Sequence, residues 1–435
     1  MLAQRYALIQ QRVLRHDMFR PKSLSHLYGH NDREDKQLQL TPMERLLGQR
    51  HSPYGSKAIM VLGVLRHLDE RYYLEDLTGL VPITLHCASL SGDFMLYEDS
   101  IYLVEGEWHD GTLMVSTIGA PVLEGRSVSL SAIYQQVQHP LFSLPPEQQL
   151  QRYATHRRVH NENPVVIFSD VHLDQPHVVQ YLEGVFAQYE SQHDLVPLFV
   201  LMGNFSSTPC TRADLQSLLQ SELGKAIKKC PYLAQEAHFC LIPGPNDVLP
   251  SAVLPWALPK VSFSQVANMH VATNPARLYW QDKEMVVYRT LPQQILEYEN
   301  AIILPSTTKP IEEGMELDEE NDPTVDCAMR LINTMMRQAH LVPGSDISPI
   351  YWNYDHSLRL YPLPSTLVLG LDCGDLALGE MVEDSQVIVP GSLSHDGAYA
   401  VYRPNTEAVE RMDSDADGGE NETLVEFVRM VPPGE

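Results

Sequence analysis

Apolar residues near the start of the chain recur at helical spacing. Leu2, Tyr6, Ile9 and Val13 fall on one face of a helix, because positions i, i+4, i+7 and i+11 lie on the same side. The same segment is basic, and its cations are Arg5, Arg12, Arg15, Arg20 and Lys22. Residues 1–50 are therefore predicted to form an amphipathic connector helix and a loop, with a basic patch for nucleic acid as the alternative.

Residues 51–125 change to the pattern of short β-strands. Five runs rich in β-branched and aliphatic residues are separated by turn signals: Ala58–Leu68, Tyr72–Asp76, Leu80–His86, Ile101–Trp108 and Thr112–Ile118. The Asp110-Gly111 step between the last two favours the positive φ of a tight hairpin. Five strands in a segment of this length predict a small closed barrel of the OB type.

A Gln-rich and Pro-rich stretch marks residues 126–163 as an interdomain linker with some helix. In residues 164–435, short apolar runs such as Val165–Phe168 and Pro197–Met202 end at polar loops and alternate with helical stretches such as Val178–Tyr189. This alternation predicts an α/β layered domain, in which the chemistry lies in loops beyond the carboxyl ends of the strands.

Two acidic stretches carry too little apolar surface to offset the entropy of ordering them. Residues 311–326 hold eight carboxylates and residues 407–422 hold seven, so the first is predicted to be a disordered insertion and the second a mobile segment. The Asp413–Gly418 run matches the opening of a calcium-binding loop. Leu424 stands where the bidentate Glu of such a loop belongs, which favours a solvated acidic loop over a calcium site.

The composition excludes several classes of protein. The 435 residues contain 31 Lys and Arg against 56 Asp and Glu, a net charge of −25, which argues against a clamp that binds phosphates through cationic surface. Six cysteines without a C-x-x-C pair disfavour a zinc ribbon and suit the reduced thiols of the cell interior. With no run of 18 apolar residues and no signal-peptide pattern, the chain is expected to be soluble, intracellular and free of membrane contact.

The loops that follow the predicted strands carry the most specific motifs. Asp170-Val171-His172, directly after a buried strand, resembles the first motif of the calcineurin-like metallophosphoesterases. In those enzymes the carboxylate and the imidazole hold one of two metal ions, which polarise a phosphate and generate hydroxide. This resemblance implies an α/β sandwich for the second domain.

The loops that match the later motifs of those enzymes occur in the same order in this chain, but they lack the metal-binding residues. Asn204 stands in place of the carboxylate that bridges both metals, Leu371 and Cys373 replace two imidazoles, and His340 is the candidate for a lone histidine. Too little charge and too few donors remain for two divalent ions. We assign no catalytic, cofactor-binding or metal residue, and an active metal-dependent phosphoesterase stays as the alternative. The vestigial site is expected at Asp170, His172, Asn204, Asn246, Asp247, His340, Leu371 and Cys373.

A further set of motifs spans most of residues 5–404. These motifs are Arg5-Tyr6, Gln11–His16, Tyr73–Gly79, Ser169–Gln175, Gly203–Ser207, Pro243–Pro245, Gln338–Leu341, Pro349–Asp355, Leu358–Pro362 and Pro390–Ser392. Together with a barrel before a degenerate phosphoesterase domain, they resemble the B subunits of eukaryotic replicative DNA polymerases, and within them the family of DNA polymerase epsilon.

This resemblance implies a non-catalytic accessory subunit in the nucleus that serves DNA replication and repair. Its partners would be the Cys-rich C-terminal domain of the catalytic subunit, the other epsilon subunits and, more weakly, the replicative helicase, with DNA met indirectly through the complex. Members of the family usually carry an extra N-terminal helical domain that serves helicase attachment. This sequence begins at the connector helix, so that role transfers only weakly.

A third functional class, a single-stranded DNA-binding module, needs cations beside stacking aromatic rings. From Gly55 to Val122, three cations face ten carboxylates, a net charge of −7, so only weak DNA binding is expected. A separate aromatic group, Tyr351, Trp352 and Tyr354, precedes an apolar run. These rings are interpreted either as core of the second domain or as anchors of the surface that holds the catalytic subunit.

Overall fold

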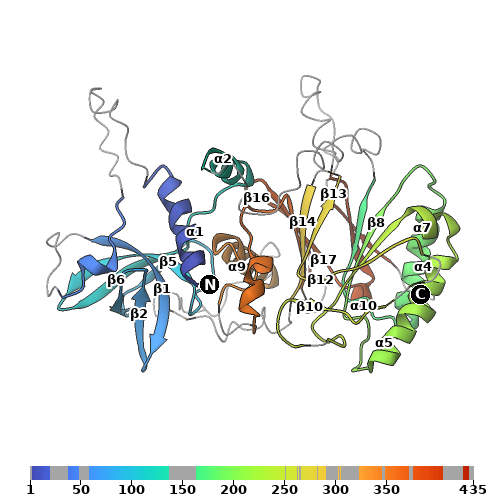
Figure 1. Ribbon diagram of the computed structural model, residues 1–435, viewed down its shortest axis with the longest axis horizontal. Coiled ribbons are helices and arrows are strands. Elements are labelled where there is room, and N and C mark those ends of the chain that lie inside the picture. Colours follow the sequence, from blue (N-terminus) through green and yellow to red (C-terminus); the bar gives the residue numbers. More distant parts are fainter. Residues whose placement is uncertain are drawn as a thin grey trace, which may run out of the picture. The chain divides into compact units, whose positions relative to one another are not determined.

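The computed structural model divides the chain into two compact units (Figure 1). The first unit contains Met1–Glu124 and Glu297–Ser348, and the second contains Gly125–Leu296 and Pro349–Glu435. The structure describes residues 2–19, 38–48, 58–136, 163–249, 251–261, 263, 266–281, 283–290, 302, 304, 323–344, 348–371, 376–404 and 425–430. The predicted acidic segment 407–422 lies outside these residues.

The first unit is built on a closed β-barrel. Its strands are β1 (Ile59–Leu68), β2 (Arg71–Glu75), β3 (Leu80–Thr84), β4 (Ser89–Ser91), β5 (Ile101–His109) and β6 (Thr112–Gly119). They lie in the order β3-β2-β1-β5-β6, and the pairing of β3 with β6 closes the sheet on itself, while β4 adds to β6 (Figure 1). The predicted OB-type barrel is confirmed.

Local sequence accounts for the curvature and the turn between β5 and β6. The hairpin turns at Asp110 and Gly111, whose φ angles are 46° and 79°, as the Asp-Gly step predicts. At Gly106 the register shifts by a β-bulge. The Cβ of any other residue there would lie 2.3 Å from the carbonyl oxygen of Met114, so the two strands approach closely only because position 106 is glycine.

A helix at the start of the chain, α1 (Leu2–Arg15), packs its apolar face on the barrel. Tyr6, Ile9 and Val13 are buried in one cluster with Leu62 and Val64 of β1. The helical face predicted from the spacing of these residues is therefore the face that the barrel covers.

Helix α9 (Pro323–Arg337) also belongs to the first unit, although it comes from the later part of the sequence. Six apolar residues line its buried face: Cys327, Ala328, Leu331, Ile332, Met335 and Met336. The expected domain 164–435 therefore differs from the compact units, because residues 297–348 group with the barrel. Of the expected disordered insertion 311–326, the last four residues form the first turn of α9, and residues 311–322 lie outside the described residues.

Two buried arginines of α1 hold the C-terminal end of α9 and the segment after it. Arg12 donates through Nη1 to the carbonyl oxygen of Met336 (3.5 Å) and through Nη2 to that of Arg337. Arg5 donates through Nη2 to the carbonyl oxygen of Pro343 (3.1 Å), beyond the helix. Met336 and Arg337 belong to the last turn of α9, where a cation also complements the helix dipole.

The described cations of α1 do not support the alternative of a nucleic-acid patch. Arg15 forms a bidentate ion pair with Glu124, at 2.8 and 3.0 Å, and the other two described arginines beside it are buried. Arg20 and Lys22 lie outside the described residues. The helix therefore connects elements of the first unit.

The turn after α9 is fastened to the edge of the barrel by one glutamine. The Ile101 backbone N–H donates to Gln338 Oε1 (3.0 Å), and Gln338 Nε2 donates to the Ile101 carbonyl (2.6 Å). Ser100 Oγ donates to the carbonyl oxygen of Pro343 (3.0 Å). A single amide side chain thus satisfies both backbone polar groups of the first residue of β5, a pairing that a neighbouring strand would otherwise supply.

The second unit contains two β-sheets. The first has the order β11-β9-β8-β7-β18-β19, formed by β7 (Val165–Phe168), β8 (Leu198–Met202), β9 (His238–Ile242), β11 (Asn268–Val271), β18 (Ala398–Tyr402) and β19 (Val425–Arg429). The other has the order β13-β14-β15-β17-β16, formed by β13 (Ala276–Trp280), β14 (Lys283–Arg289), β15 (Thr366–Gly370), β16 (Ala377–Val382) and β17 (Ser385–Pro390). A short pair joins β10 (Trp256–Ala257) to β12 (Thr273–Asn274).

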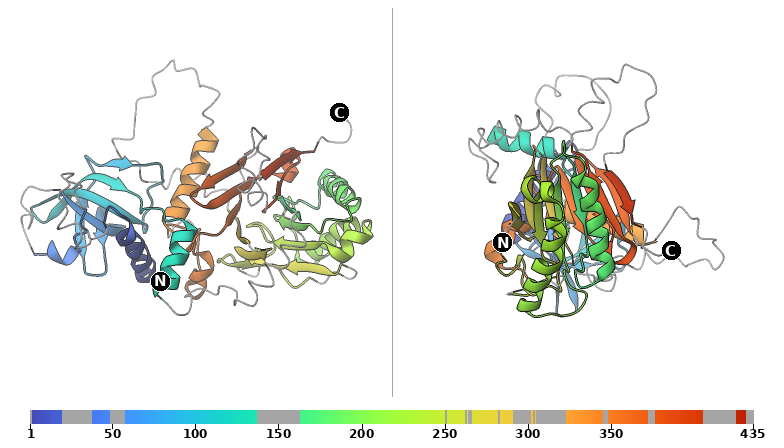
Figure 2. Two further views of the ribbon diagram at one scale, coloured as in Figure 1. Left: turned by 90° about the horizontal axis from the view of Figure 1, so that it is seen from above. Right: turned by 90° about the vertical axis from the view of Figure 1, so that its right-hand side faces the viewer.

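These sheets and a layer of helices make a sandwich. One buried cluster joins the sheets, with Ile167 and Val200 from one and Val287 and Val368 from the other. A second cluster lies between the six-stranded sheet and the helices on its outer face (Figure 2). Those helices are α4 (Pro176–Glu190), α5 (Arg212–Leu218), η3 (Leu219–Leu223), α6 (Gly224–Lys228) and α7 (Pro231–Glu236). The predicted α/β sandwich is confirmed, and none of the described helices is long and apolar enough to cross a membrane.

The predicted linker 126–163 begins with helix α2 (Arg126–Gln136), and residues 137–162 lie outside the described residues. The carboxylate of Asp384 accepts from the backbone N–H groups of Arg126 and Ser127, at 2.5 and 2.8 Å. These are unpaired donors of the first turn, so a carboxylate from the turn before β17 starts the helix. Its first turn is therefore fixed to the second unit.

Replacing Arg12 by Ala should destabilise the first unit by about 3 kcal/mol, because the buried carbonyls at the end of α9 lose a charged donor. The measurement is urea unfolding, with amide hydrogen exchange in α9 as the local readout. Leu14→Ala is the matched control, since Leu14 lies on the exposed side of the same helix and should cost less than about 0.5 kcal/mol. Equal stability of both variants would contradict the role given to Arg12.

Candidate functional site

The loops after three neighbouring parallel strands meet at one edge of the six-stranded sheet. Asp170 follows β7, Asn204 follows β8 and Asn246 follows β9. Together with His172 they line a cavity of ≈ 470 Å³, whose other walls carry the hydroxyl side chains of residues 206–208, 392 and 394 and the imidazole of His395. The structure thus brings four of the eight predicted residues into one cavity.

The wall of this cavity is organised by a buried arginine, Arg289, the last residue of β14. Its side chain is fully buried, and its Nη2 pairs with Asp170 Oδ1 at 2.5 Å. Arg289 Nε donates to the carbonyl oxygen of Gly203 (3.0 Å), and Nη1 donates to that of Gly370 (2.9 Å). One guanidinium therefore ties the ends of β7 and β8 in one sheet to the ends of β14 and β15 in the other.

Arg289 compensates the charge of the carboxylate that a phosphoesterase would give to a metal ion. Asp170 is 3 % exposed, and an uncompensated buried carboxylate would be costly. The guanidinium occupies one carboxylate oxygen, whereas Asp170 Oδ2 is buried without a hydrogen bond. A cation of the chain itself therefore takes over the electrostatic part of a metal's role.

Asp247 and Asn204 bond the loops that follow β8 and β9 to each other. Asp247 accepts from the backbone N–H groups of Phe205 (2.7 Å) and Gly244 (2.8 Å). Burial raises the pKa of Asp247 to about 6, against the lowering by those two hydrogen bonds. Asn204 Oδ1 accepts from the backbone N–H of Asn246 (2.9 Å). Polar side chains and backbone N–H groups of neighbouring loops are thus bonded to one another.

Glycines make this close packing of the loops possible. A Cβ on Gly203 would lie 2.0 Å from Asp247 Oδ2, and a Cβ on Gly244 would lie 2.4 Å from Asn204 Oδ1. Both distances are far below van der Waals contact. The two glycines are therefore needed for the approach of the side chains to the backbone, whatever the cavity binds.

Two of the other predicted site residues, His340 and Leu371, are described, and neither is among the residues that line this cavity. His340 belongs to the first unit, where it is buried and its Nδ1 lies 3.1 Å from the backbone nitrogen of Val342. Leu371 is a buried apolar residue at the end of β15, and Cys373 lies outside the described residues. The Gln338–Leu341 motif belongs to the turn that is fastened to the barrel, and the assignment of His340 to the vestigial site stays a prediction.

The residues present do not fit a two-metal centre. In the part of the chain that the structure describes, no group of three or more His, Cys, Asp and Glu side chains is placed to hold a metal ion. The bridging position is the amide of Asn204, and one oxygen of Asp170 is taken by Arg289. Divalent ions need several anionic or imidazole ligands at once, and this arrangement offers too few.

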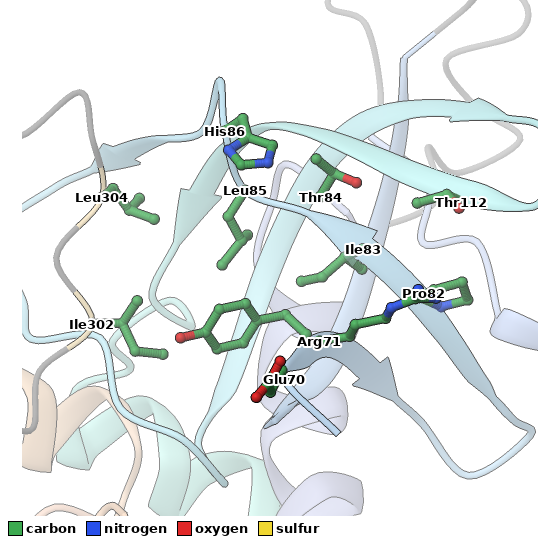
Figure 3. Close-up of a pocket in the computed structure, with 11 residues that line it drawn as sticks. Glu70, Arg71, Pro82, Ile83, Thr84, Leu85, His86, Thr112, Ile302 and Leu304 are labelled. Atoms are coloured by element: carbon green, nitrogen blue, oxygen red, sulfur yellow. The ribbon is translucent and has the colours of Figure 1, made fainter. Parts of the chain in front are cut away.

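The barrel of the first unit carries a second cavity, of ≈ 510 Å³. Figure 3 shows Ile302 and Leu304 on the side of this cavity opposite Pro82 and Thr112. The backbone N–H of Ile302 donates to the carbonyl oxygen of Leu96 (2.8 Å), so this part of the chain is fastened to the barrel. The side chains that line this cavity are mainly apolar, whereas the grooves that bind single-stranded nucleic acid are cationic.

One of the two described arginines of the barrel strands is paired with carboxylates. Arg66 is paired with Glu75 (2.7 Å) and with Asp99. Arg71 is exposed and lines the ≈ 510 Å³ cavity together with Glu70. Weak DNA binding by the barrel stays a prediction from its composition.

Two family models match the chain. Residues 1–122 match the model described as DNA polymerase epsilon subunit 2-like, OB-fold domain, and residues 165–376 match the model for the B subunit of DNA polymerases alpha and epsilon. The OB barrel and the α/β sandwich together are thus those of a B subunit of a DNA polymerase.

The relatives narrow this class to one family. The B subunit of DNA polymerase epsilon from Arabidopsis thaliana is 34 % identical over 425 residues, which cover 94 % of this chain and 74 % of the relative. The DNA polymerase epsilon subunit 2 of Homo sapiens is 30 % identical with the same coverage. The chain belongs to the DNA polymerase epsilon subunit 2 family, and the resemblance inferred from its motifs is confirmed.

A solved structure described as "Structural and Functional Characterization of a Novel Archaeal Phosphodiesterase" aligns with 61 % of this chain and 99 % of its own. The two share 11 % identity with a TM-score of 0.28, and similarity at this level assigns no function. The chemistry of the cavity must therefore be argued from its own residues.

Sequence reasoning missed Arg289, the residue that organises the cavity. The apolar run Met285–Tyr288, which reads as a strand in the sequence, stops one residue before it. A cation that directly continues a buried apolar strand is a weak signal of a buried ion pair. Its carboxylate partner, Asp170, is 119 positions away in the sequence, so no local pattern connects the two.

Replacing Arg289 by Gln should lower the free energy of unfolding by about 4 kcal/mol, because the buried Asp170 loses its counter-charge. Removing the carboxylate as well, in the double variant Asp170→Asn/Arg289→Gln, should recover part of this loss. Urea unfolding of the two single variants and the double variant gives the coupling energy.

The matched control is the exposed pair of Arg403 and Glu426 in the same unit, at 3.2 Å. Arg403→Gln should change the stability by less than about 1 kcal/mol. If Arg289→Gln were no more destabilising than this control, the buried pair would not hold the loops together.

Proposed function

We propose that this protein is a non-catalytic accessory subunit of the DNA polymerase epsilon complex. In this role it holds the Cys-rich C-terminal domain of the catalytic subunit, contacts the other epsilon subunits and acts in nuclear DNA replication and repair, with the replicative helicase as a further candidate partner. Its association with DNA is indirect and occurs through the complex. Membership of the subunit 2 family and the names of the relatives support this proposal.

The observation that carries the non-catalytic part is the pairing of Arg289 with Asp170. A divalent ion in a phosphoesterase polarises the phosphate and lowers the pKa of a bound water to generate hydroxide. A guanidinium donates hydrogen bonds in a fixed plane and stays protonated, so it supplies neither an open coordination position nor a metal-bound nucleophile. The cavity is therefore a vestigial site, at Asp170, His172, Asn204, Asn246 and Asp247.

We expect no turnover of bis(p-nitrophenyl) phosphate with manganese, zinc or magnesium, because no metal-bound hydroxide can form. His172→Ala serves as the control, since His172 lines the cavity but takes no part in the buried ion pair. Turnover by the wild type that disappears in this variant would contradict the proposal and favour the active phosphoesterase.

The test of the scaffold role is co-expression with the C-terminal domain of the epsilon catalytic subunit, followed by gel filtration. A stable complex buries about 1,200 Å² or more, so the two proteins should elute together at micromolar concentration and moderate salt. If both are folded by circular dichroism and still elute separately, this proposal is wrong.

A further inference from the structure

A short segment of the second unit exposes three aromatic rings. Tyr351, Trp352 and Tyr354 are 49 %, 75 % and 54 % exposed, and Trp352 is the most exposed large apolar side chain in the described part of the chain. They lie at the start of the 3₁₀-helix η5 (Trp352–Leu358). The interpretation of these rings as core is therefore wrong, since each presents about half or more of its surface to solvent.

The backbone that carries the rings is firmly held. The backbone N–H of Tyr351 donates to the carbonyl oxygen of Leu254 (2.9 Å), and the Tyr351 hydroxyl lies 3.3 Å from Ser251 Oγ. On the other side of η5, the buried carboxylate of Asp355 accepts from Arg359 Nε (2.9 Å) and Nη2 (2.8 Å). Rings on a fixed backbone lose little conformational entropy when a partner covers them.

The segment belongs to one of the motifs that carry the family resemblance, Pro349–Asp355, and packing explains only part of that motif. Asp355 points inward and is buried, whereas the three rings do not contribute to the core. Trp and Tyr are the side chains that most often dominate protein interfaces. A surface that contacts a partner explains why the motif also contains three exposed aromatic residues.

The net charge of the chain indicates which kind of molecule binds such a surface. A net charge of −25 repels the phosphates of DNA and opposes close contact with a second copy of the same chain. The same charge attracts a partner with basic surface and speeds its encounter. The favoured occupant is thus a protein with an apolar pocket surrounded by lysine and arginine.

We infer that Tyr351, Trp352 and Tyr354 anchor the docking surface for such a protein. The inference rests on the proposed function, in which this partner is the catalytic subunit of the polymerase. The rings enter the apolar centre of the contact, and the net negative charge of the chain favours a partner with a basic rim.

The experiment measures the affinity of the full chain for the C-terminal domain of the catalytic subunit by isothermal titration calorimetry. W352A/Y354A should weaken binding at least tenfold, because interface aromatics of this kind are frequent hot spots. Tyr351 stays unchanged, since its hydroxyl lies beside Ser251. The matched control is V128A/M381A, which removes two other exposed apolar side chains of the same unit and should change the affinity less than twofold.

The outcomes separate this inference from the proposed function. If the wild type does not bind the domain, the proposed function fails and the inference fails with it. If the wild type binds and W352A/Y354A binds equally well, only the inference is overturned. A variant effect that appears instead on binding of a single-stranded oligonucleotide, or on dimerisation in sedimentation velocity, also overturns it. Thermal unfolding of both variants should match the wild type, because all the altered side chains are exposed.

Discussion

A charge buried in a protein must be compensated, and in the second unit one guanidinium meets that requirement at the junction of two sheets. Arg289 neutralises Asp170 and donates to carbonyl oxygens at the ends of β8 and β15. The loops that carry Asn204 and Asp247 pack around these contacts through backbone hydrogen bonds. The phosphoesterase-like architecture can thus persist without a metal ion, because its electrostatic centre is part of the polypeptide.

The larger features of the fold follow from local pattern in the sequence. The barrel strands and the parallel strands β7, β8 and β9 were predictable because burial alternates with period two or fills short apolar runs. The apolar face of α1 was predictable for the same reason. The Asp110-Gly111 hairpin followed from turn chemistry. Each of these signals lies within about fifteen residues, which is the range over which periodicity is informative.

Features that depend on distant contacts were not predictable. The acidic composition of residues 311–326 concealed the start of α9, whose helix is held by contacts with the barrel and with Arg12. The role of the segment around His340, the candidate for the lone histidine, was not predictable either, because its Gln338 bonds the backbone of Ile101, 237 positions away. In the site, the grouping of Asp170, His172, Asn204 and Asn246 was expected from the resemblance of their loops to the phosphoesterase motifs. The partner of Asp170 did not, because it comes from a different sheet.

The path of the chain has a consequence for biosynthesis. The polypeptide leaves the first unit after Glu124, returns to it at Glu297 and leaves it again after Ser348. On a ribosome the barrel strands emerge early, but α9 and Gln338 emerge only after more than half of the second unit has been made. Until then the backbone edge of the barrel that Gln338 binds stays exposed. This stretch of synthesis is therefore the period in which a chaperone protects the nascent barrel most.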